Sequence, residues 1–406
     1  MKVYFSGISG TGIGPLAELA QDAGYEICGS DLSHGAIADE LDRRGVAVFY
    51  GEQDGGFLQK CHDAGKIDWF VYTSALPADH KELALAKELG IHCSKRDEFL
   101  AELVREKNLK MIAVAGTHGK TTTTSMLVWS FEQLGIPVSY LVGTTLPWGN
   151  GGKFDPASEF FIYEADEYDR NFLAYRPYIG AITTVDYDHP DIYPTVEDYQ
   201  NAFAQFESQC EHVVKSTTLF PGINLVGELR RQDASLAAQA IVQAIPEVDQ
   251  TKLTSVLNNF PGTGRRFERI LDGVYSDYGH HPAEIKATLE MARELKERDG
   301  YKGVVAIYEP HQNVRQHEIK DQYRDAFETA DKIFWLPTYL TRENPNLEVL
   351  TPAQLFANLT NVDCAEAAEA NETLAQKLQA LHNEGWLLIL MTAGPADSWY
   401  RKIFQA

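Results

Sequence analysis

Cysteines are few in this sequence, and no pairing pattern connects them. Five are spread over 406 residues, and no two form a Cys-x-x-Cys pair. Disulfide frameworks and structural zinc sites both need closely spaced cysteines. The sequence therefore excludes a small disulfide-stabilised scaffold and a cysteine zinc site, and we expect free thiols in a reducing cytoplasm.

Long apolar runs and a basic surface are absent as well. No apolar run approaches the ~20 residues that cross a bilayer. Lys and Arg number 36 against 58 Asp and Glu, which gives a formal net charge of -22. That charge repels phosphate polyanions. We therefore expect neither a nucleic-acid nor a membrane partner, and anionic small substrates must be held by local groups.

The chain has the length and the alternation of a multidomain α/β protein. Its 406 residues exceed what one hydrophobic core usually spans. Strand-like and helix-like stretches alternate throughout, which predicts mainly parallel sheets covered by helices. A polar run at 105–110 and turn residues at 261–264 mark two boundaries. We expect three segments, 1–108, 109–264 and 265–406.

A phosphate-binding turn opens the second segment. The apolar run 111–115 leads into Gly116-Thr117-His118-Gly119-Lys120-Thr121-Thr122 and the start of a helix. The glycines let successive N–H groups face phosphate oxygens, and the helix N-terminus adds to the attraction. Lys120 can reach the β- and γ-phosphates, and the hydroxyl of Thr121 or Thr122 can bind Mg²⁺. Val114 replaces the first glycine of the general P-loop, so only the second half of that pattern is present.

A second glycine-rich turn stands near the start of the chain. An apolar strand runs into Gly7-Ile8-Ser9-Gly10-Thr11-Gly12, and a second strand ends at Asp31. In a βαβ unit such a turn cradles a diphosphate, and an acidic residue at this place commonly meets a ribose hydroxyl. A purely structural turn or an NAD site fits the same residues.

Polar side chains follow two apolar strands of the second segment. Glu164-Ala165-Asp166-Glu167 follows the first strand, and Asp188-His189 follows the next. Ligands of parallel sheets bind beyond the carboxyl ends of strands. Glu164 supplies oxygen ligands for Mg²⁺, and His189 can complete a second metal site. The alternatives are a solvated turn for the acidic cluster and a structural role for His189.

Two histidine-containing loops mark the third segment. Asp277, His280 and His281 follow one strand-like stretch, and His311 and Arg315 follow another. Two such loops at strand ends suggest a site, whereas helix capping and loop packing are the alternative.

These motifs together resemble the Mur ligase family, ATP-dependent enzymes that join an amino acid to a cell-wall nucleotide precursor. The resemblance covers nearly the whole chain and rests on the stretches 7–10, 29–31, 116–122, 164–167, 188–189, 265–268, 277–284, 309–311 with Arg315, and 391–394. It implies an α/β fold of three domains: a Rossmann-like N-terminal domain for the UDP-sugar, a central P-loop ATPase domain, and a Rossmann-like C-terminal domain. The last would close over the others and supply the amino-acid site.

The resemblance also implies a role for individual residues. Catalysis would use Lys120, Glu164, His189, Asp277, His280, His281, His311 and Arg315. ATP would be bound by Gly116, Thr117, His118, Gly119, Lys120, Thr121, Thr122, Arg230, Asp233 and Arg265. Mg²⁺ would be held by Thr121, Glu164 and His189, and the UDP-sugar by Gly7, Ser9, Gly10, Thr11, Gly12, Asp31 and Ser74.

The alanine-adding branch of the family is the nearest in sequence features. The implied reaction joins the lactyl carboxylate of UDP-N-acetylmuramate to L-alanine through an acyl phosphate, carried out by a monomer or homodimer. Asp277 and the adjacent histidines would orient the amine, and Arg315 would grip the amino-acid carboxylate. Phe203 stands where several related ligases carry a carbamylated lysine, which favours this branch.

Several departures keep alternatives open. The adenine signature of the family would fall at 227–233, where its His and both Asn are replaced, although Arg230 could stack on the base and Asp233 could accept from its amino group. Tyr168 favours a murein peptide ligase, which attaches a recovered tripeptide to the same UDP-sugar. A nucleotide-binding regulatory protein without ligase activity and an NAD-dependent oxidoreductase are the alternatives of other classes.

Overall fold

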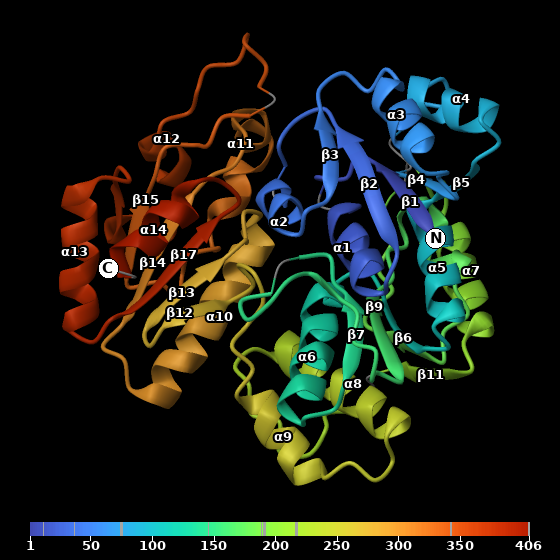
Figure 1. Cartoon of the computed structure of the whole chain (residues 1–406). Coiled ribbons are helices and arrows are strands. Elements are labelled where there is room, and N and C mark those ends of the chain that lie inside the picture. Colours follow the sequence, from blue (N-terminus) through green and yellow to red (C-terminus); the bar gives the residue numbers. More distant parts are fainter. Residues whose placement is uncertain are drawn as a thin grey trace. The chain divides into compact units, whose positions relative to one another are not determined.

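The computed structural model of the chain contains three sheets covered by helices (Figure 1). It describes residues 1–404 except Thr11, Ala36, Ser74, Ala75, Thr145, Asp188, Pro190, Asp191, Ser216, Thr217 and Arg342. Most strand pairs are parallel, which confirms the α/β fold expected from the alternation of strand-like and helix-like stretches.

The first sheet is entirely parallel and has helices on both faces. Its strand order is β3 (Ala47–Tyr50), β2 (Glu26–Asp31), β1 (Lys2–Ser6), β4 (Trp69–Tyr72) and β5 (His92–Lys95). Its helices are α1 (Gly14–Asp22), α2 (Ala38–Arg43), α3 (Gly56–Ala64), α4 (Lys81–Glu88) and α5 (Arg96–Glu106). Successive strand residues point to opposite faces, so Val3 and Phe5 pack with α1 and α5, whereas Tyr4 packs with α3 and α4.

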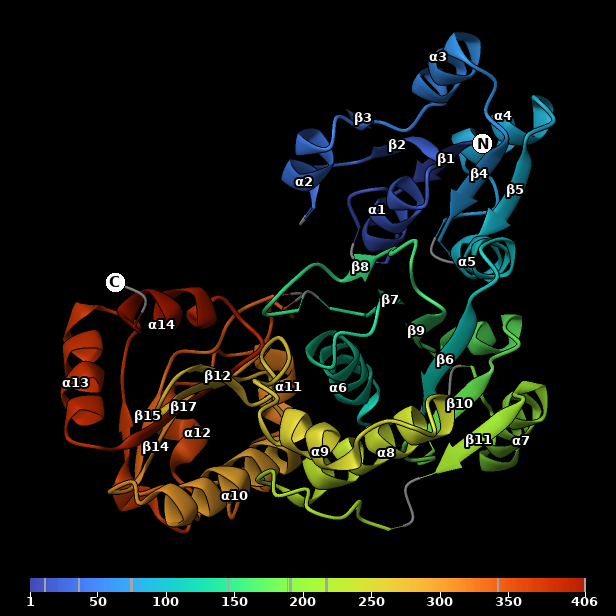
Figure 2. The same cartoon turned by 60° about the horizontal axis from the view of Figure 1, so that its bottom comes forward.

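The second sheet carries the P-loop between its strand β6 and helix α6. Its order is β11 (His212–Lys215), β10 (Ile179–Ile182), β6 (Lys110–Ala115), β9 (Phe160–Glu164), β7 (Val138–Leu141) and β8 (Gly152–Lys153), and only β8 is antiparallel to its neighbour. Around it are α6 (Lys120–Gln133), the 3-10 segment η1 (Tyr168–Ala174), α7 (Val196–Gln209), α8 (Glu228–Ala244) and α9 (Gln250–Asn258). Helix α6 packs against β6, β7 and β9 (Figure 2).

The third sheet is built from the C-terminal part of the chain. Its order is β12 (Glu268–Leu271), β13 (Val274–Asp277), β17 (Leu387–Thr392), β14 (Val304–Glu309), β15 (Lys332–Trp335) and β16 (Ala365–Ala367), with only β12 antiparallel. Its helical segments are α10 (Pro282–Asp299), α11 (Asn313–Ile319), η2 (Lys320–Tyr323), α12 (Pro352–Phe356), η3 (Val362–Cys364), α13 (Glu372–Asn383) and α14 (Ala396–Phe404). Along β14, Ala306 and Tyr308 pack with α10, whereas Val305 and Ile307 pack with α13 and α14.

Contacts divide the chain into two compact units. The first comprises residues 1–223 and 232–260 and holds the first two sheets, and the second comprises 224–231 and 261–406 and holds the third sheet. One hydrophobic cluster, with Phe5 of β1 and Phe161 of β9 among its members, joins the first two sheets. The three-domain boundaries at 108/109 and 264/265 stay predictions.

Neither a disulfide nor a membrane-spanning helix is found among the residues that the structure describes. The five cysteines form no disulfide. Within the part of the chain that the structure describes, no helix is long and apolar enough to span a bilayer.

Candidate active site

The turn between β6 and α6 has the backbone shape of a phosphate-binding loop. Gly116 and Gly119 have φ angles of +138° and +84°, which residues with side chains rarely adopt. A Cβ on Gly116 would also meet Oγ1 of Thr183 at 2.0 Å. Thr117 N donates to the carbonyl oxygen of Thr184 at 2.7 Å, which anchors the turn to the end of β10. Since α6 begins at Lys120, the N–H groups of its first turn have no partner within the helix and suit phosphate oxygens.

A buried carboxylate holds the P-loop lysine. Lys120 Nζ lies 2.8 Å from Oε2 and 3.0 Å from Oε1 of Glu167, whose side chain is 1% exposed. The same ammonium donates to the carbonyl oxygen of Gly116 at 2.6 Å. His189 Nε2 lies 3.7 Å from Glu167 Oε1. Glu167, which the sequence placed only in a polar cluster, therefore connects two residues expected in catalysis.

Two of the expected metal ligands are in direct contact. Thr121 Oγ1 donates to Glu164 Oε1 at 2.7 Å, and Gly143 N donates to Glu164 Oε2 at 2.9 Å. Burial raises the pKa of Glu164, against the opposing effect of these hydrogen bonds and of Lys120. A cation would offset that burial, and a carboxylate with a hydroxyl is the oxygen pair that Mg²⁺ prefers. The two residues therefore fit the ion, although no cluster of three His, Cys, Asp or Glu with metal-site geometry occurs among the described residues.

A cleft of about 290 Å³ connects the glycine-rich turn of the first sheet to the P-loop of the second. Gly12 and Arg96 line it from the first sheet, and Lys120, Glu164 and Asp166 line it from the second. Two cations thus face a space beside the expected phosphate and metal sites. The cleft therefore carries charges of both signs, with Arg96 and Lys120 as its cations and Asp97, Glu164 and Asp166 as its carboxylates.

Arg96 is a cleft residue that the sequence reasoning missed. A Cβ on Gly12 would meet Arg96 Nη1 at 2.7 Å, so the guanidinium occupies room that this glycine leaves. The adjacent Asp97 is 3% exposed and accepts from the hydroxyls of Tyr163 at 3.0 Å and Tyr175 at 2.9 Å. These contacts attach the start of α5 to the second sheet and so present Arg96 to the cleft. A charged pair directly after a strand was the available signal in the sequence.

The first glycine-rich turn is closed by its own backbone and by Asp31. Gly7, with a φ of +81°, donates its N–H to the carbonyl oxygen of Ser30 at 2.8 Å. Ser9 N donates to Asp31 Oδ2 at 2.9 Å, while the buried hydroxyl of Ser9 has no partner among the described residues. The assignment of this turn to the UDP-sugar stays a prediction. Thr11 and Ser74, also expected there, and Asp188 beside His189 lie outside the described residues.

The two residues expected at adenine fall in different units of the structure. Arg230 is in the second unit and lies over the ring of Phe267, 5.5 Å from its centroid. Asp233 is in the first unit, and its carboxylate packs beside the P-loop, since a Cβ on Gly119 would meet its Oδ1 at 2.4 Å. The role of each in binding adenine stays a prediction.

Asp277 and His281 have structural partners at the carboxyl edge of the third sheet. Asp277 is buried, which raises its pKa, and it accepts from Phe267 N at 2.7 Å, Gly279 N at 2.7 Å and Thr288 Oγ1 at 3.0 Å. His281 Nδ1 accepts from Ala283 N at 3.4 Å and thereby caps α10. These bonds hold the loop and the helix start, and a role in orienting the amine stays a prediction.

The other expected residues of the third sheet lie in one aromatic group or beside it. The rings of His280 and His311 are 5.7 Å apart, and His311 stacks on Tyr339 at 5.8 Å. Arg315 stands on α11 and makes no hydrogen bond or ion pair with a residue that the structure describes. The expected role of Arg315 in holding the amino-acid carboxylate stays a prediction.

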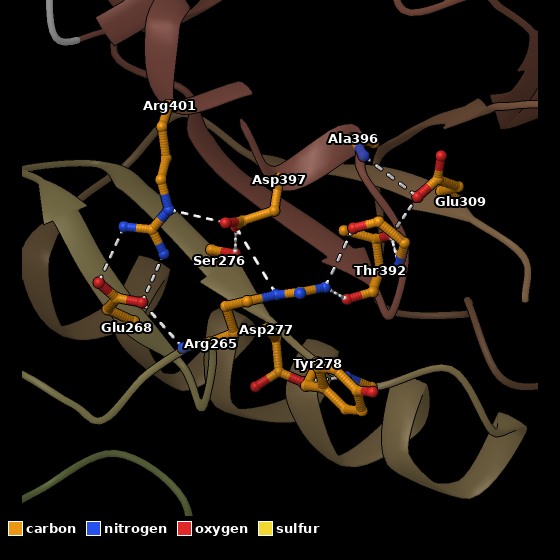
Figure 3. A network of polar contacts seen from close by, with 12 residues as sticks. Arg265, Glu268, Ser276, Asp277, Tyr278, Glu309, Thr392, Ala396, Asp397 and Arg401 are labelled. Atoms are coloured by element: carbon orange, nitrogen blue, oxygen red, sulfur yellow. Dashed lines mark hydrogen bonds and ion pairs between the residues drawn. The ribbon is translucent and has the colours of Figure 1, made fainter. Parts of the chain in front are cut away.

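Arg265 belongs to a polar network at the ends of β13, β14 and β17 (Figure 3). Its guanidinium donates to the carbonyl oxygens of Thr392 and Gly394 and lies over Tyr278, 4.8 Å from the ring centroid. Its φ of +58° is strained for a residue with a side chain. These contacts are all within the second unit, and the expected role of Arg265 in binding ATP stays a prediction.

Comparisons with known proteins agree with the motifs. Residues 2–108 match the catalytic domain of the Mur ligase family, and residues 114–217 match the Mur ligase middle domain. A UDP-N-acetylmuramate–L-alanine ligase of Campylobacter jejuni strain 81-176 is 31% identical over 405 residues, covering 87% of this chain and 90% of that protein. One from Clostridium acetobutylicum is 28% identical, covering 97% and 95%.

Solved structures show the same fold. The UDP-N-acetylmuramate–alanine ligase of Thermotoga maritima aligns with a TM-score of 0.74 at 20% identity, over 100% of this chain and 98% of that one. A murein peptide ligase of Psychrobacter arcticus aligns with a TM-score of 0.57 at 21% identity, over 100% and 97%. The chain belongs to the Mur ligase family, as its motifs predict.

Proposed function

We propose that this chain is an ATP-dependent ligase that joins UDP-N-acetylmuramate to L-alanine in the synthesis of peptidoglycan precursors. The names of its relatives support this reading. The observation that carries it is the cleft in which Gly12 and Arg96 face Lys120 and Glu164. A carboxylic acid attached to a nucleotide diphosphate needs a site of this kind, with anion-binding groups on one side and a phosphate loop on the other.

The first chemical step is the activation of the acid. A carboxylate oxygen of UDP-N-acetylmuramate attacks the γ-phosphorus of ATP, the bond to the bridging oxygen of ADP breaks, and an acyl phosphate forms. Arg96 holds the anionic substrate, and Lys120 leaves Glu167 to neutralise charge that builds up on the transferred phosphoryl group. Mg²⁺, when bound by Thr121 and Glu164, supplies further charge neutralisation at the phosphates.

The second step forms the amide. The uncharged amine of the amino acid attacks the acyl carbon, and inorganic phosphate leaves from the tetrahedral intermediate. Neither step needs a covalent bond to the protein, so the residues act by positioning and by charge. We further propose that the enzyme works in the cytoplasm on small molecules alone, as a monomer or a homodimer.

A murein peptide ligase is the second candidate function. Tyr168 favours it, and the ring of this tyrosine lies edge-on to His189 at 5.3 Å, beside the Lys120–Glu167 pair. The two candidates share the UDP-sugar and ATP and differ in the acceptor. Only the acceptor therefore separates them.

The test is phosphate release from ATP in the presence of UDP-N-acetylmuramate. We expect L-alanine to give the highest kcat/KM when it is compared with glycine, L-serine and the tripeptide. A preference for the tripeptide would select the murein peptide ligase. Absence of acceptor-dependent phosphate release with all four would contradict ligase activity and favour a nucleotide-binding regulatory protein.

A further inference from the structure

Glu268, Asp277 and Asp397, at the carboxyl edge of the third sheet, are satisfied within the protein (Figure 3). Glu268 forms a two-pronged ion pair with Arg401, at 2.9 and 2.5 Å. Asp397 accepts from Ser276 Oγ at 2.5 Å and from Arg401 Nε at 2.8 Å. Asp277 accepts from two backbone N–H groups and one hydroxyl. Each of the three therefore has a structural explanation.

Glu309, at the end of β14, has no comparable set of partners. Its oxygen Oε2 accepts from the hydroxyl of Thr392 and, at 3.3 Å, from Ala396 N. Its other oxygen, Oε1, points away from Thr392 (Figure 3), and no residue within the described ranges donates to it or forms an ion pair with it. The residue is nevertheless only 8% exposed.

Leaving a carboxylate in this state is costly. Burial of the side chain removes most of its hydration, although Oε1 still reaches solvent. Burial accordingly raises the pKa of Glu309, although its hydrogen bonds and the nearby Arg265 oppose that rise. A side chain that is left half-paired at the ligand-binding edge of a parallel sheet is a candidate for contact with a positively charged ligand group.

Gly394 lets Glu309 and Tyr339 approach each other closely. A Cβ on Gly394 would lie 2.3 Å from Glu309 Oε2 and 2.9 Å from Tyr339 Cγ. The carboxylate and the tyrosine ring therefore come together only because position 394 has no side chain. Tyr339 in turn stacks on His311. A carboxylate beside an aromatic face is an environment that favours an ammonium group.

We propose that Glu309 binds the ammonium group of the acceptor amino acid and accepts the proton that this group loses before it attacks. The inference rests on the proposed ligase function. The proton passes from the ammonium nitrogen to Oε1, and the freed electron pair forms the bond to the acyl carbon. The carbon–oxygen bond to phosphate then breaks, and the leaving phosphate takes up the second proton that the nitrogen loses. Arg315 follows six positions later, on α11. The two residues offer opposite charges for the two ends of an amino-acid zwitterion.

A purely structural role for Glu309 predicts a different pattern. Through Ala396 N and the Thr392 hydroxyl, the side chain also stabilises the start of α14. If that were its only task, Glu309→Gln would lower stability and weaken all reactions alike. If Glu309 binds the ammonium, only reactions of a charged acceptor suffer.

The experiment compares Glu309→Gln with the wild type in three assays. Without acceptor, UDP-N-acetylmuramate-dependent exchange of ADP into ATP should be unchanged, because it reports acyl-phosphate formation. With hydroxylamine, which is uncharged at neutral pH, formation of the hydroxamate should also be unchanged. With L-alanine, KM should rise about tenfold or more, as expected for a lost hydrogen bond to a charged group.

Two further variants keep the outcome interpretable. Glu366→Gln removes an exposed carboxylate of the same unit that pairs with Lys377, and it should match the wild type throughout. Glu309→Asp keeps the charge, and its KM for L-alanine should lie between those of the wild type and Glu309→Gln. If Glu309→Gln does not fold, Glu309→Asp takes its place in the three assays.

Two results would overturn the inference. One is a KM for L-alanine within about twofold of the wild type in Glu309→Gln, since that effect is far below the cost of a charged hydrogen bond. The other is an equal loss with hydroxylamine and L-alanine. A wild type that is inactive in all three assays would contradict the ligase function itself, and the inference with it.

Discussion

Lys120 Nζ and Glu167 Oε2 lie 2.8 Å apart, so the charge of the P-loop is neutralised inside the protein. A phosphate that binds in the P-loop must compete with Glu167 for the ammonium of Lys120. The same carboxylate lies 3.7 Å from His189. Binding of ATP and the placement of His189 are thereby coupled through one buried side chain.

Lys120→Ala should abolish ATP turnover, and it should also lower stability, because it leaves the buried carboxylate of Glu167 without its counter-charge. The ammonium acts on the γ-phosphate, and its removal should lower kcat by about a hundredfold or more. Phosphate release and thermal unfolding measure the two effects. Lys110→Ala, at an exposed lysine of the same sheet, is the control and should keep full activity. Retention of more than about a tenth of wild-type turnover would contradict the assignment of the P-loop.

Glu167→Gln should destabilise the ATP-free enzyme and enlarge the stabilisation that ATP provides. The variant leaves a partly buried lysine without its counter-charge, which costs about 1–3 kcal/mol. ATP can then contact the ammonium of Lys120 without competition from a carboxylate at position 167. Thermal unfolding with and without ATP gives both quantities. Glu159→Gln, which breaks the exposed pair with Lys110 at 48% and 61% exposure, should change stability by less than about 1 kcal/mol. Equal effects of the two variants would contradict the coupling.

Arg96→Ala should weaken the binding of the UDP-sugar without affecting L-alanine. The guanidinium is the cation that α5 presents to the cleft beside Gly12, so KM for UDP-N-acetylmuramate should rise about tenfold or more. Steady-state kinetics with each substrate varied in turn provides the measurement. Arg105→Ala, at the exposed end of the same helix, is the matched control. Similar increases in the KM values of all three substrates would show that Arg96 supports the fold and does not bind the UDP-sugar.

Arg315→Lys should weaken the apparent affinity for L-alanine alone. Lysine keeps the charge and loses the two-pronged geometry that suits a carboxylate, with about 1.5–3 kcal/mol at stake. The measurement is the KM of the variant for L-alanine, ATP and the UDP-sugar, each compared with that of the wild type. If ATP and the UDP-sugar are affected to the same degree, the amino-acid carboxylate is held elsewhere.

Glu18→Gln should stabilise the protein at neutral pH and not in acid. Burial raises the pKa of Glu18 from its usual 4.5 to about 6, against the attraction of Arg44. Because the folded state binds this proton more tightly, the wild type loses stability as the pH rises through about 6. The glutamine variant lacks that loss, so its stability should exceed that of the wild type by about 2 kcal/mol above neutrality, and the difference should vanish below the usual glutamate pKa of 4.5. Denaturant unfolding of the wild type and the variant, above neutrality and in acid, gives the two stabilities. A difference between them that stays constant with pH would contradict the prediction.

Local signals account for the parts of the fold and site that the sequence predicts well. The P-loop depends on a few consecutive residues, and its glycines do adopt the backbone angles that such a turn needs. Thr121 and Glu164 meet because Glu164 ends β9 and Thr121 follows the adjacent strand β6, a proximity that parallel pairing produces. The alternation of strands with helix-covered connections likewise needs no long-range information.

Long-range packing explains what the sequence could not provide. Arg96 becomes a cleft residue through Gly12, far away along the chain, and through the tyrosines that bind Asp97. Asp277 and Glu309 are both acidic residues at strand ends, yet only the structure shows that the first is fully hydrogen-bonded and the second is not. Residue type and position alone do not separate these two cases.

The most direct test of the account follows the substrate oxygen. UDP-N-acetylmuramate whose carboxylate carries heavy oxygen is incubated with ATP and L-alanine, and the products are analysed by mass spectrometry. If ligation proceeds through an acyl phosphate, one heavy oxygen appears in the released phosphate and the amide product keeps the other. Amide formation with unlabelled phosphate, or phosphate release without an amide product, would contradict the proposed reaction.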